Sequence, residues 1–348
     1  MSDAHRQQRE AAFGQLRSEG RDALARALGP ARRVALIGFP WHLNIGDSLI
    51  VLGSMALLDE LNVELGYVAD GGTYDPRALR RAVPDGPILL AGGGNFGDRY
   101  HHHQLLRERV ILDFPDRRII SLPQTMEWVG DSGSLEQCHR VYSQHPDLTV
   151  LVRDHDGVDA ASAIFGAHMI RFSPDHALGL PPIVRVPPPT QGVKVLKRAD
   201  REAVVEKWNT DLFPLAATSD WTVEPRTRIT VQGLAVFIVA ATKLGRRSRL
   251  IERARVAAFR SIAEHLVDQG VRTLAIGKTV VTDRLHAAVL GLLIGREVLL
   301  VDNANRKLSL IFHDYLHTIP GAELCTDFRE AAARTRGDDG TRIDAVHR

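Results

Sequence analysis

The sequence predicts an α/β protein of two domains, each with a mostly parallel sheet between layers of helices. Three observations lead to this prediction. Short apolar runs alternate with amphipathic stretches of helical period, the pattern of parallel strands joined by crossover helices. Polar residues gather directly after the apolar runs, where such sheets bind ligands. The length of 348 residues fits about two domains, each with a core of its own.

The N-terminal domain is predicted to open with a helix over residues 1–28, which Gly29-Pro30 ends. Buried strands and helices then alternate along the chain. Gly46 gives the loop before the second helix room to turn, and Asp47 or Ser48 can cap that helix. The predicted strands are 34–38, 64–70, 88–91, 118–122, 149–152 and 168–172, and the later helices are 48–61, 76–82, 99–115, 135–143 and 158–165.

Two proline clusters, Pro181-Pro182 and Pro187 to Pro189, predict an extended linker between the domains. We therefore expect an N-terminal domain over residues 1–185 and a C-terminal domain over 186–348, with a loose polar tail after residue 337. The apolar run from Leu234 is expected to be buried. The predicted strands of the second half are 192–196, 273–276, 279–281 and 297–301, and its helices are 248–269, one beginning near Thr282, and 328–334.

Composition narrows the class of protein. A hydrophobic content of 44% and a charged content of 25% are typical of a soluble globular protein, and a formal charge of +2 without a basic, aromatic stripe argues against nucleic acid. Cys138 and Cys325 lie far apart and predict neither a metal site nor a disulfide framework, so a cytoplasmic location is expected. The longest apolar runs are too short to span a bilayer, which leaves contact with a membrane surface open.

Polar residues follow the predicted strands of the N-terminal domain. Carboxyl ends of parallel strands meet at one edge of a sheet, so these residues should form a functional rim. An ordinary ion pair is the alternative for Arg153 and its neighbour Asp154. The residues of the rim are Asn44, Asp47, Asn95, Asp98, Gln124, Arg153 and Asp175.

The segment GGGNFGD, Gly92 to Asp98, follows a buried strand and predicts a loop that faces a ligand. Three glycines permit positive φ and a close approach of backbone to ligand at Gly93 and Gly94, whereas a tight turn is the alternative. The spacing matches neither the dinucleotide fingerprint nor the P-loop. Next come His101, His102 and His103, which point in three directions on a helix, so they predict contact with a substrate rather than a shared metal.

The stretch from Lys278 to Gly295 predicts an anion site in the second domain. Thr282 and Asp283 are good N-cap residues, which places Arg284 and His286 in the first turn of a helix just beyond a strand. A helix N-terminus and a guanidinium both favour a carboxylate or a phosphate. The alternative is structural: Asp283 caps the helix, Arg284 pairs with an acid, and His286 lies on the surface.

Several of these motifs occur together in one order: Asn44-x-Gly46-Asp47, GGGNFGD, SLPQT at 121–125, VRD at 152–154 and TDRLHA at 282–287. As a set, from about Val34 to Leu316, they resemble the polysaccharide pyruvyl transferase family. The Asp220-Trp221 pair is also similar to that family's. The resemblance implies a GT-B-like fold, with two Rossmann-like domains that face a cleft. The stretch from Leu196 to Leu250 departs most from the family pattern.

The resemblance further implies transfer of a pyruvyl group from phosphoenolpyruvate to two hydroxyls of a sugar, which makes a cyclic ketal. The sugar belongs to a glycan precursor, with lipid linkage and action at the inner face of the membrane left open. No cofactor and no metal are expected. The predicted roles are catalysis by His286, Asp47 and Asp98; donor binding by Arg153, Arg284, Leu285, His286 and Lys307; and acceptor binding by Asn44, Gly93, Gly94, Asn95, His103 and Gln124.

Two other functions share the expected architecture. One is a GT-B-type glycosyltransferase that uses a nucleotide sugar, and the other is a glycan-binding protein without catalysis. Phosphate release from phosphoenolpyruvate, nucleoside diphosphate release, and binding without turnover distinguish the three.

Overall fold

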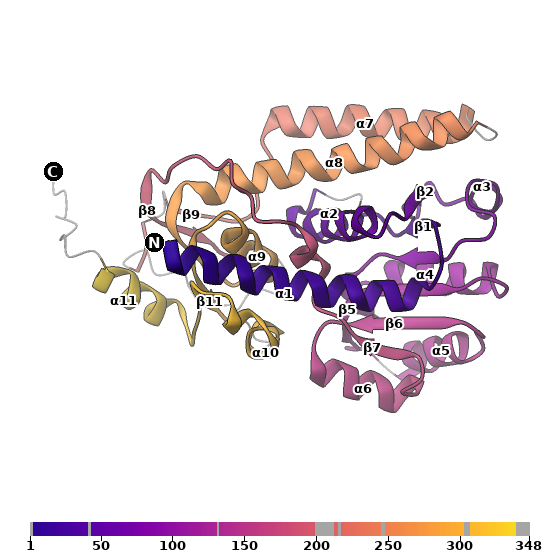
Figure 1. Cartoon of the computed structure of the whole chain (residues 1–348), viewed down its shortest axis with the longest axis horizontal. Coiled ribbons are helices and arrows are strands. Elements are labelled where there is room, and N and C mark those ends of the chain that lie inside the picture. Colours follow the sequence, from indigo (N-terminus) through magenta and orange to yellow (C-terminus); the bar gives the residue numbers. More distant parts are fainter. Residues whose placement is uncertain are drawn as a thin grey trace. The chain divides into compact units, whose positions relative to one another are not determined.

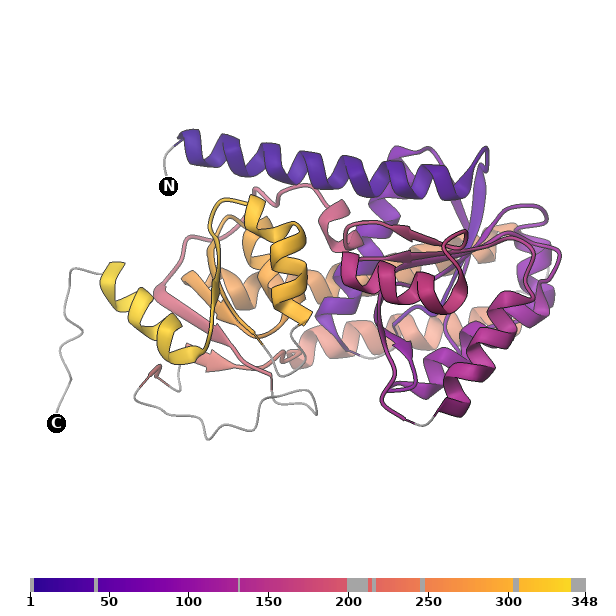
Figure 2. The same ribbon diagram turned by 90° about the horizontal axis from the view of Figure 1, so that it is seen from below.

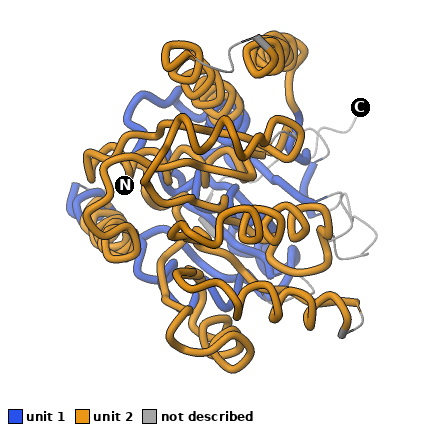
Figure 3. The backbone as a smooth tube through the Cα atoms, turned by 90° about the vertical axis from the view of Figure 1, so that its right-hand side faces the viewer, with its two compact units in different colours: residues 1–9, 182–222, 270–348 blue, residues 10–181, 223–269 orange. Residues whose placement is uncertain are grey.

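The computed structural model describes residues 3–40, 43–130, 132–198, 212–214, 217–244, 248–302 and 307–338. The chain divides into two units (Figure 3). Unit 1 comprises residues 1–9, 182–222 and 270–348, and unit 2 comprises 10–181 and 223–269. The change of unit at 181/182 lies within the proline-rich segment. Residues 223–269 belong to unit 2, a division that differs from the sequence-based domains because this segment returns to the first half of the chain.

The described strands of unit 2 form a parallel sheet in the order β2-β1-β3-β5-β6-β7, and β4 also pairs with β5 (Figure 1). The connections from β1 to β2 and from β5 to β7 run in opposite directions along the sheet. Right-handed crossovers therefore place their helices on opposite faces. The strands are β1 (Arg33–Ile37), β2 (Glu64–Ala69), β3 (Ile88–Leu90), β4 (Gly93–Gly97), β5 (Ile119–Glu127), β6 (Leu148–Val152) and β7 (Ile170–Phe172).

Local capping groups define where helices of unit 2 begin, as α3 shows. Asp75 caps α3 by accepting hydrogen bonds from the N–H groups of Arg77 and Ala78, and Pro76 occupies the first helical position, where a missing N–H costs nothing. The helices are α1 (Asp3–Leu28, whose first residues count with unit 1), α2 (Ile45–Glu60), α3 (Pro76–Ala82), α4 (His101–Asp113), α5 (Ser132–Ser143), α6 (His155–Phe165), the 3-10 helix η1 (His176–Gly179), α7 (Pro225–Leu244) and α8 (Arg249–Ala275).

The core of unit 2 includes aromatic side chains that fix β4 against α5 and α6. Phe96 of β4 stacks on Tyr142 with ring centroids 5.7 Å apart, and the ring centroid of Phe165 lies 5.9 Å from that of Phe96. All three are buried. Such rings contribute both buried area and a preferred geometry, so they anchor a glycine-rich strand that has little side chain of its own.

Unit 1 holds a second parallel sheet (Figure 2). Its described strands run in the order β12-β11-β10-β8-β9. Two separate sheets confirm the predicted fold class, an α/β protein consistent with a two-domain GT-B-like arrangement. The elements are β8 (Gln191–Leu196), β9 (Thr218–Ser219), β10 (Gly277–Thr282), α9 (Leu285–Leu293), β11 (Glu297–Val301), α10 (Lys307–Asp314), the 3-10 helix η3 (Leu316–Thr318), β12 (Ala322–Cys325) and α11 (Phe328–Asp338).

Two local predictions of the second half are wrong. The strand predicted over 273–276 is the end of α8, and the strand of the sheet is β10, which begins at Gly277. Four buried apolar residues do not distinguish a strand from a helix end by periodicity. The apolar run from Leu234 forms part of α7, where Ile238 is buried but Val236 is 70% exposed. The buried side of α7 therefore accounts for only part of its apolar residues.

Cys138 and Cys325 are both buried free thiols, as the absence of a disulfide framework in the sequence predicts. Burial raises the pKa of Cys138 well above its ordinary value and that of Cys325 to about 11. Neither is therefore a thiolate near neutral pH. Among the helices that the structure describes, none is long and apolar enough to cross a membrane.

Candidate active site

The predicted site residues fall into two groups, one in each unit. Asn44 to Arg153 belong to unit 2, and Arg284 to Lys307 belong to unit 1. Asp98 and Arg153 in unit 2 and Arg284 in unit 1 follow the carboxyl ends of parallel strands, the edge at which open α/β sheets bind ligands. Other predicted site residues lie within elements: Gly93, Gly94 and Asn95 in β4, Gln124 in β5 and His103 in α4.

The turn before α2 brings Asn44, Asp47 and Gly93 together. The Asn44 side chain caps α2 by accepting from the Gly46 N–H at 2.9 Å, and its Nδ2 donates to Asp47 Oδ2 at 2.9 Å. A Cβ built on Gly93 would lie 3.7 Å from Asp47 Oδ1 and 3.5 Å from Ile50. Asp47 therefore lies against the glycine backbone at this edge of the sheet.

The glycine segment was predicted to be a loop, but part of it forms strand β4. It stays a candidate for contact with a ligand. Gly93 pairs with Gln124, and Gly97 pairs with Glu127, across a bulge. Gly93 and Gly97 have φ values of +129° and +131°, which side chains rarely adopt. A Cβ on Gly97 would lie 1.8 Å from the Glu127 carbonyl oxygen, so β4 can approach β5 only with glycine there.

A buried arginine that the sequence analysis missed, Arg107 of α4, holds this edge together. Its Nη1 donates to the Asn95 carbonyl at 2.9 Å, and its Nη2 donates to Gln124 Oε1 at 2.9 Å and also contacts Asn95 Oδ1. The Gln124 nitrogen in turn donates to the Ala91 carbonyl and to Ser121 Oγ. Gln124 is fully buried, so it supports Arg107 and Asn95 from inside the sheet. Its predicted acceptor-binding role stays a prediction.

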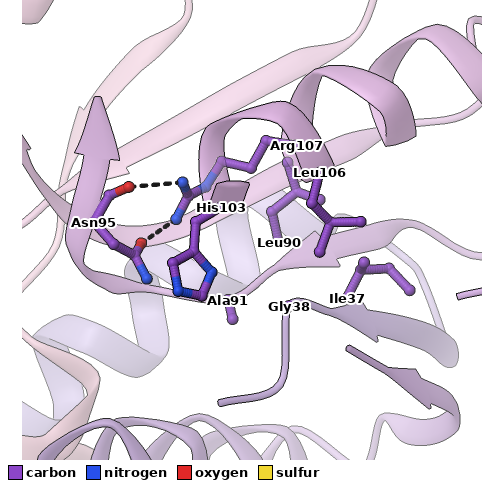
Figure 4. A pocket seen from close by; sticks show the side chains of 8 residues that line it. All are labelled: Ile37, Gly38, Leu90, Ala91, Asn95, His103, Leu106 and Arg107. Carbon is purple, nitrogen blue, oxygen red and sulfur yellow. Dashed lines mark hydrogen bonds between the residues drawn. The ribbon is translucent and has the colours of Figure 1, made fainter. Parts of the chain in front are cut away.

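A small pocket opens above this network (Figure 4). His103 and Arg107 are four residues apart, on one face of α4, and both line the pocket opposite Asn95. That spacing is the one signal that the sequence offers for Arg107, and it does not reveal the hydrogen-bond partners, which lie outside α4. His101 and His102 are exposed, and no cluster of metal-ligating residues occurs in the part of the chain that the structure describes. The lining residues are Ile37, Gly38, Leu90, Ala91, Asn95, His103, Leu106 and Arg107.

Asp98, which follows β4, binds backbone. Its two carboxylate oxygens accept from the N–H groups of Val129 and Gly130, each at 2.7 Å. This arrangement fixes the turn after β5. The catalytic role predicted for Asp98 stays a prediction, and the geometry gives both oxygens a structural task.

Arg153, directly after β6, lies in a buried ion pair. Its Nη1 donates to Asp175 at 2.6 Å and its Nε donates to Thr125 Oγ1 at 2.7 Å. The side chains of Arg153 and Asp175 are 5% and 1% exposed. Asp154, the neighbour considered as a partner, instead caps α6 through the Gly157 N–H. A Cβ on Gly94 would lie 3.4 Å from Arg153 Nη2, so a glycine leaves that nitrogen uncrowded.

In unit 1, Thr282 ends β10 and Asp283 follows it, but neither side chain caps α9. Thr282 Oγ1 donates to the Leu196 carbonyl at 2.7 Å and accepts from the Arg284 N–H at 3.0 Å. Asp283 is buried and accepts from the Arg198 N–H at 2.8 Å, and its burial raises the pKa of its carboxyl group. The predicted capping role is therefore wrong, because Thr282 bonds the last residue of β8 and Asp283 bonds Arg198, two residues beyond it. Arg284 itself is the N-cap.

The guanidinium of Arg284 is held by Asp220 in a two-bond geometry. Nε and Nη2 donate to the two Asp220 oxygens at 2.7 and 2.8 Å. The two side chains are 12% and 23% exposed, more than those of the Arg153 pair. Leu285 and His286 are half-buried in the first turn of α9. Lys307 begins α10, but its side chain lies outside the described residues.

These features define a class: an α/β protein with two parallel sheets and an arginine just beyond a strand end in each. The family model of the polysaccharide pyruvyl transferases matches residues 44–305, and the chain belongs to that family. The resemblance seen in the sequence motifs is thereby confirmed.

The chain is also similar to individual proteins. "Pyruvyl transferase 1" of Schizosaccharomyces pombe is 31% identical over 314 residues, which cover 85% of this chain and 73% of that protein. "General stress protein 30" of Bacillus subtilis is 25% identical over 301 residues, 84% of this chain and 80% of that protein. A crystal structure of a functionally uncharacterised protein from Klebsiella pneumoniae shares the fold, with a TM-score of 0.56, 17% identity, and coverage of 89% and 98%.

Proposed function

We propose that this protein transfers the pyruvyl group of phosphoenolpyruvate to two hydroxyls of one sugar in a polysaccharide or glycolipid precursor. The product is a cyclic ketal, and inorganic phosphate is released. Membership of the family supports pyruvylation of a polysaccharide in general. The choice of donor and of the bond formed is our proposal, argued from the chemistry of the site residues. It places the reaction in the cytoplasm, where phosphoenolpyruvate is produced.

The observation that carries the proposal is the placement of Arg284. Its guanidinium lies at the start of α9, immediately after a parallel strand, and Asp220 fixes the plane of its fork. Phosphoenolpyruvate carries a carboxylate and a phosphate, which guanidinium groups bind in a planar, two-bond geometry. The helix N-terminus adds roughly half a positive charge at the same place. Asp220 then acts as the positioning residue for the donor-binding arginine.

The reaction requires a proton at the methylene carbon, addition of one hydroxyl to the neighbouring carbon, loss of phosphate, and closure by the second hydroxyl. Of the two protons that the hydroxyls lose, one is balanced by the proton that the methylene group gains, and the other leaves with phosphate, which also carries away the oxygen that it brought. We assign His286 the transfer of a proton, because an imidazole ring can both donate and accept a proton and His286 lies in the same turn as Arg284.

The base that receives a hydroxyl proton is assigned to Asp47 ahead of Asp98. Both oxygens of Asp98 accept from backbone N–H groups, which commits them to the turn after β5. Asp47 lies beside the Gly93 backbone and is oriented by the Asn44 amide. Gly93, Gly94, Asn95 and His103 are assigned to the acceptor sugar, because glycine backbone, an amide and an imidazole offer hydrogen bonds suited to sugar hydroxyls.

The test is an incubation of the protein with phosphoenolpyruvate and candidate glycans, followed by a phosphate assay and mass spectrometry of the glycan. Phosphate release together with a pyruvate ketal on the glycan supports the proposal. Nucleoside diphosphate release from a nucleotide sugar would favour the glycosyltransferase, and glycan binding without turnover would favour the non-catalytic protein.

His286→Asn tests the assigned proton transfer. We expect turnover to fall by about 100-fold or more, since general acid–base catalysis typically contributes a factor of about 100 to 10,000, while donor affinity changes little. His317→Asn, at an exposed histidine of the same unit, is the matched control and should retain full turnover. Full turnover by the His286→Asn protein would show that His286 does not transfer a proton in the reaction.

A further inference from the structure

Helix α7 presents an exposed stripe that neither the sheet of unit 2 nor the candidate active site uses. The stripe has helical spacing, apolar or small residues in its middle and a cation at each end. Ile229 and Val236 are 69% and 70% exposed. This exposure is large for apolar side chains at helical spacing, which normally form the face that packs against the core. The residues of the stripe, all exposed, are Arg226, Ile229, Gly233, Val236, Ala240 and Lys243.

The opposite side of α7 accounts for its packing. Val231 and Ile238 are buried, and Thr227 donates from Oγ1 to Gln269 of α8 at 3.2 Å. Gln269 in turn donates to Glu224 at 3.2 Å. Figure 1 shows α7 running beside α8. The helix is therefore held to unit 2 through one side, and the stripe is a second apolar face. Phe237 and Val239, 44% and 40% exposed, widen it.

Charge decides which partner fits the stripe. The 20 residues of α7 include Arg226, Arg228 and Lys243 but no aspartate or glutamate. The exposed first turns of α8 add Arg249 and Arg253. In a symmetric pairing of two stripes, parallel or antiparallel, cationic ends would oppose cationic ends, which is unfavourable. An apolar face rimmed by cations complements an anionic lipid surface instead.

We propose that α7 is an interfacial helix, which docks this protein on a bilayer that contains anionic lipid. The helix lies in the plane of the interface, with Ile229 and Val236 among the acyl chains and the arginines at the level of the headgroups. A helix of 20 residues is roughly 30 Å long, enough for several headgroup contacts along its length. Membrane docking of this kind is compatible with the absence of a spanning helix among the described residues.

The experiment is vesicle flotation of the full chain, without donor or acceptor, so its outcome does not depend on the proposed reaction. Two kinds of vesicle are compared: phosphatidylcholine alone, and equal parts of phosphatidylcholine and phosphatidylglycerol. We expect flotation with the anionic vesicles, little with the neutral ones, and loss of binding at high salt, since the attraction of the arginines is screened.

Two variants and a control locate the contact. Ile229→Gln/Val236→Gln removes the apolar contribution, and Arg226→Glu/Arg228→Glu reverses the charge at one end. Each should reduce binding to anionic vesicles by about tenfold or more. Leu112→Gln, at an apolar residue of α4 that is 62% exposed, is the matched control and should bind like the unchanged protein. All five positions are exposed, and the melting temperature of each variant verifies folding.

Three results would overturn the proposal. The first is failure of the unchanged protein to float with anionic vesicles, and the second is undiminished binding by both α7 variants. The third is a dimer in sedimentation experiments that Ile229→Gln/Val236→Gln dissociates. Exposed Glu264 and Asp268 of α8 are acids that a second copy could offer to the arginines, so this outcome would assign the stripe to a protein interface.

Discussion

The two arginines that follow parallel strands differ in how they are held. Arg153 of unit 2 bonds Asp175 and Thr125 and is nearly inaccessible, with the Gly94 backbone beside its remaining nitrogen. Arg284 of unit 1 is more exposed, and one acid, Asp220, binds its fork by two bonds. A buried pair is costly to break, whereas a pair at the surface of a site can exchange partners. We infer that Arg153 is chiefly a fixed charge at the sheet edge and that Arg284 makes the direct contact with a ligand.

The largest expected effect is on stability, from Arg153→Ala. This change leaves Asp175 buried without its cation, so the free energy of unfolding should fall by about 3–5 kcal/mol in urea titrations. Arg80→Ala, which breaks the exposed pair with Asp116, is the control and should cost less than about 1 kcal/mol. Equal losses in the two variants would abolish the contrast between buried and exposed pairs.

Arg284→Ala should act on the reaction. Loss of one preorganised charged contact typically costs about 2.7–4 kcal/mol, which corresponds to about 100- to 1000-fold in rate, while stability falls by about 1 kcal/mol or less. Arg284→Lys should retain only part of the rate that Arg284→Ala loses, because an ammonium group cannot form two parallel hydrogen bonds to one ligand group. Donor affinity, turnover and melting temperature are measured on both variants. Unchanged kinetics with a lowered melting temperature would make Arg284 a structural partner of Asp220.

Gly93→Val tests the glycine edge of unit 2. Its φ of +129° disfavours a β-branched residue, and the new side chain would meet Ile50 and Asp47, so stability should fall by about 1–3 kcal/mol and activity should be lost. Gly14→Val, at a helical glycine with open space around its Cβ position, is the matched control. Full activity of Gly93→Val would show that β4 is only a connection within the sheet.

Stability is expected to depend on pH because of His176, the residue after Asp175. Ser54 Oγ donates to the Ile50 carbonyl, so its hydrogen bond with His176 Nδ1, at 3.0 Å, requires Nδ1 to be the donor. Burial lowers the pKa of His176 from 6.5 to about 4. The unfolded chain therefore binds the proton first as the pH falls, and stability is lost between about pH 6.5 and pH 4, by about 2 kcal/mol from pH 7 to pH 5.

Urea titrations at these two pH values measure that slope. His176→Asn removes the titrating group, so its stability should change with pH by about 2 kcal/mol less than that of the unchanged protein. An identical pH dependence in the two proteins would show that other groups account for the loss.

Strands and helices with strong local signals were predictable from the sequence. The helix over 76–82 and the strand over 297–301 have the predicted bounds, since an Asp-Pro cap and a run of β-branched and apolar residues determine them locally. Strand β4 was not predictable, because glycines carry no strand propensity and its pairing depends on β5. The end of α8 was wrongly predicted to be a strand, because four buried apolar residues are too few to distinguish a helical period from a strand period.

The candidate site was predictable in its position but not in its contacts. Polar residues at strand ends and the family motifs located Arg153 and Arg284. Their partners, Asp175 and Asp220, lie 22 and 64 residues away in sequence, a separation that local patterns do not resolve. Arg107 escaped notice for the same reason, since its bonds to Asn95 and Gln124 arise only when α4 packs on the sheet.

The burial of both cysteines makes the protein a convenient background for thiol-specific labelling. Maleimide dyes react with accessible thiolates, and neither Cys138 nor Cys325 offers one near neutral pH. A single cysteine introduced at an exposed position, such as Val236→Cys on α7, would therefore be modified far faster than the two native thiols. Fluorescent and spin probes can thus be attached at one chosen site without first replacing any native residue.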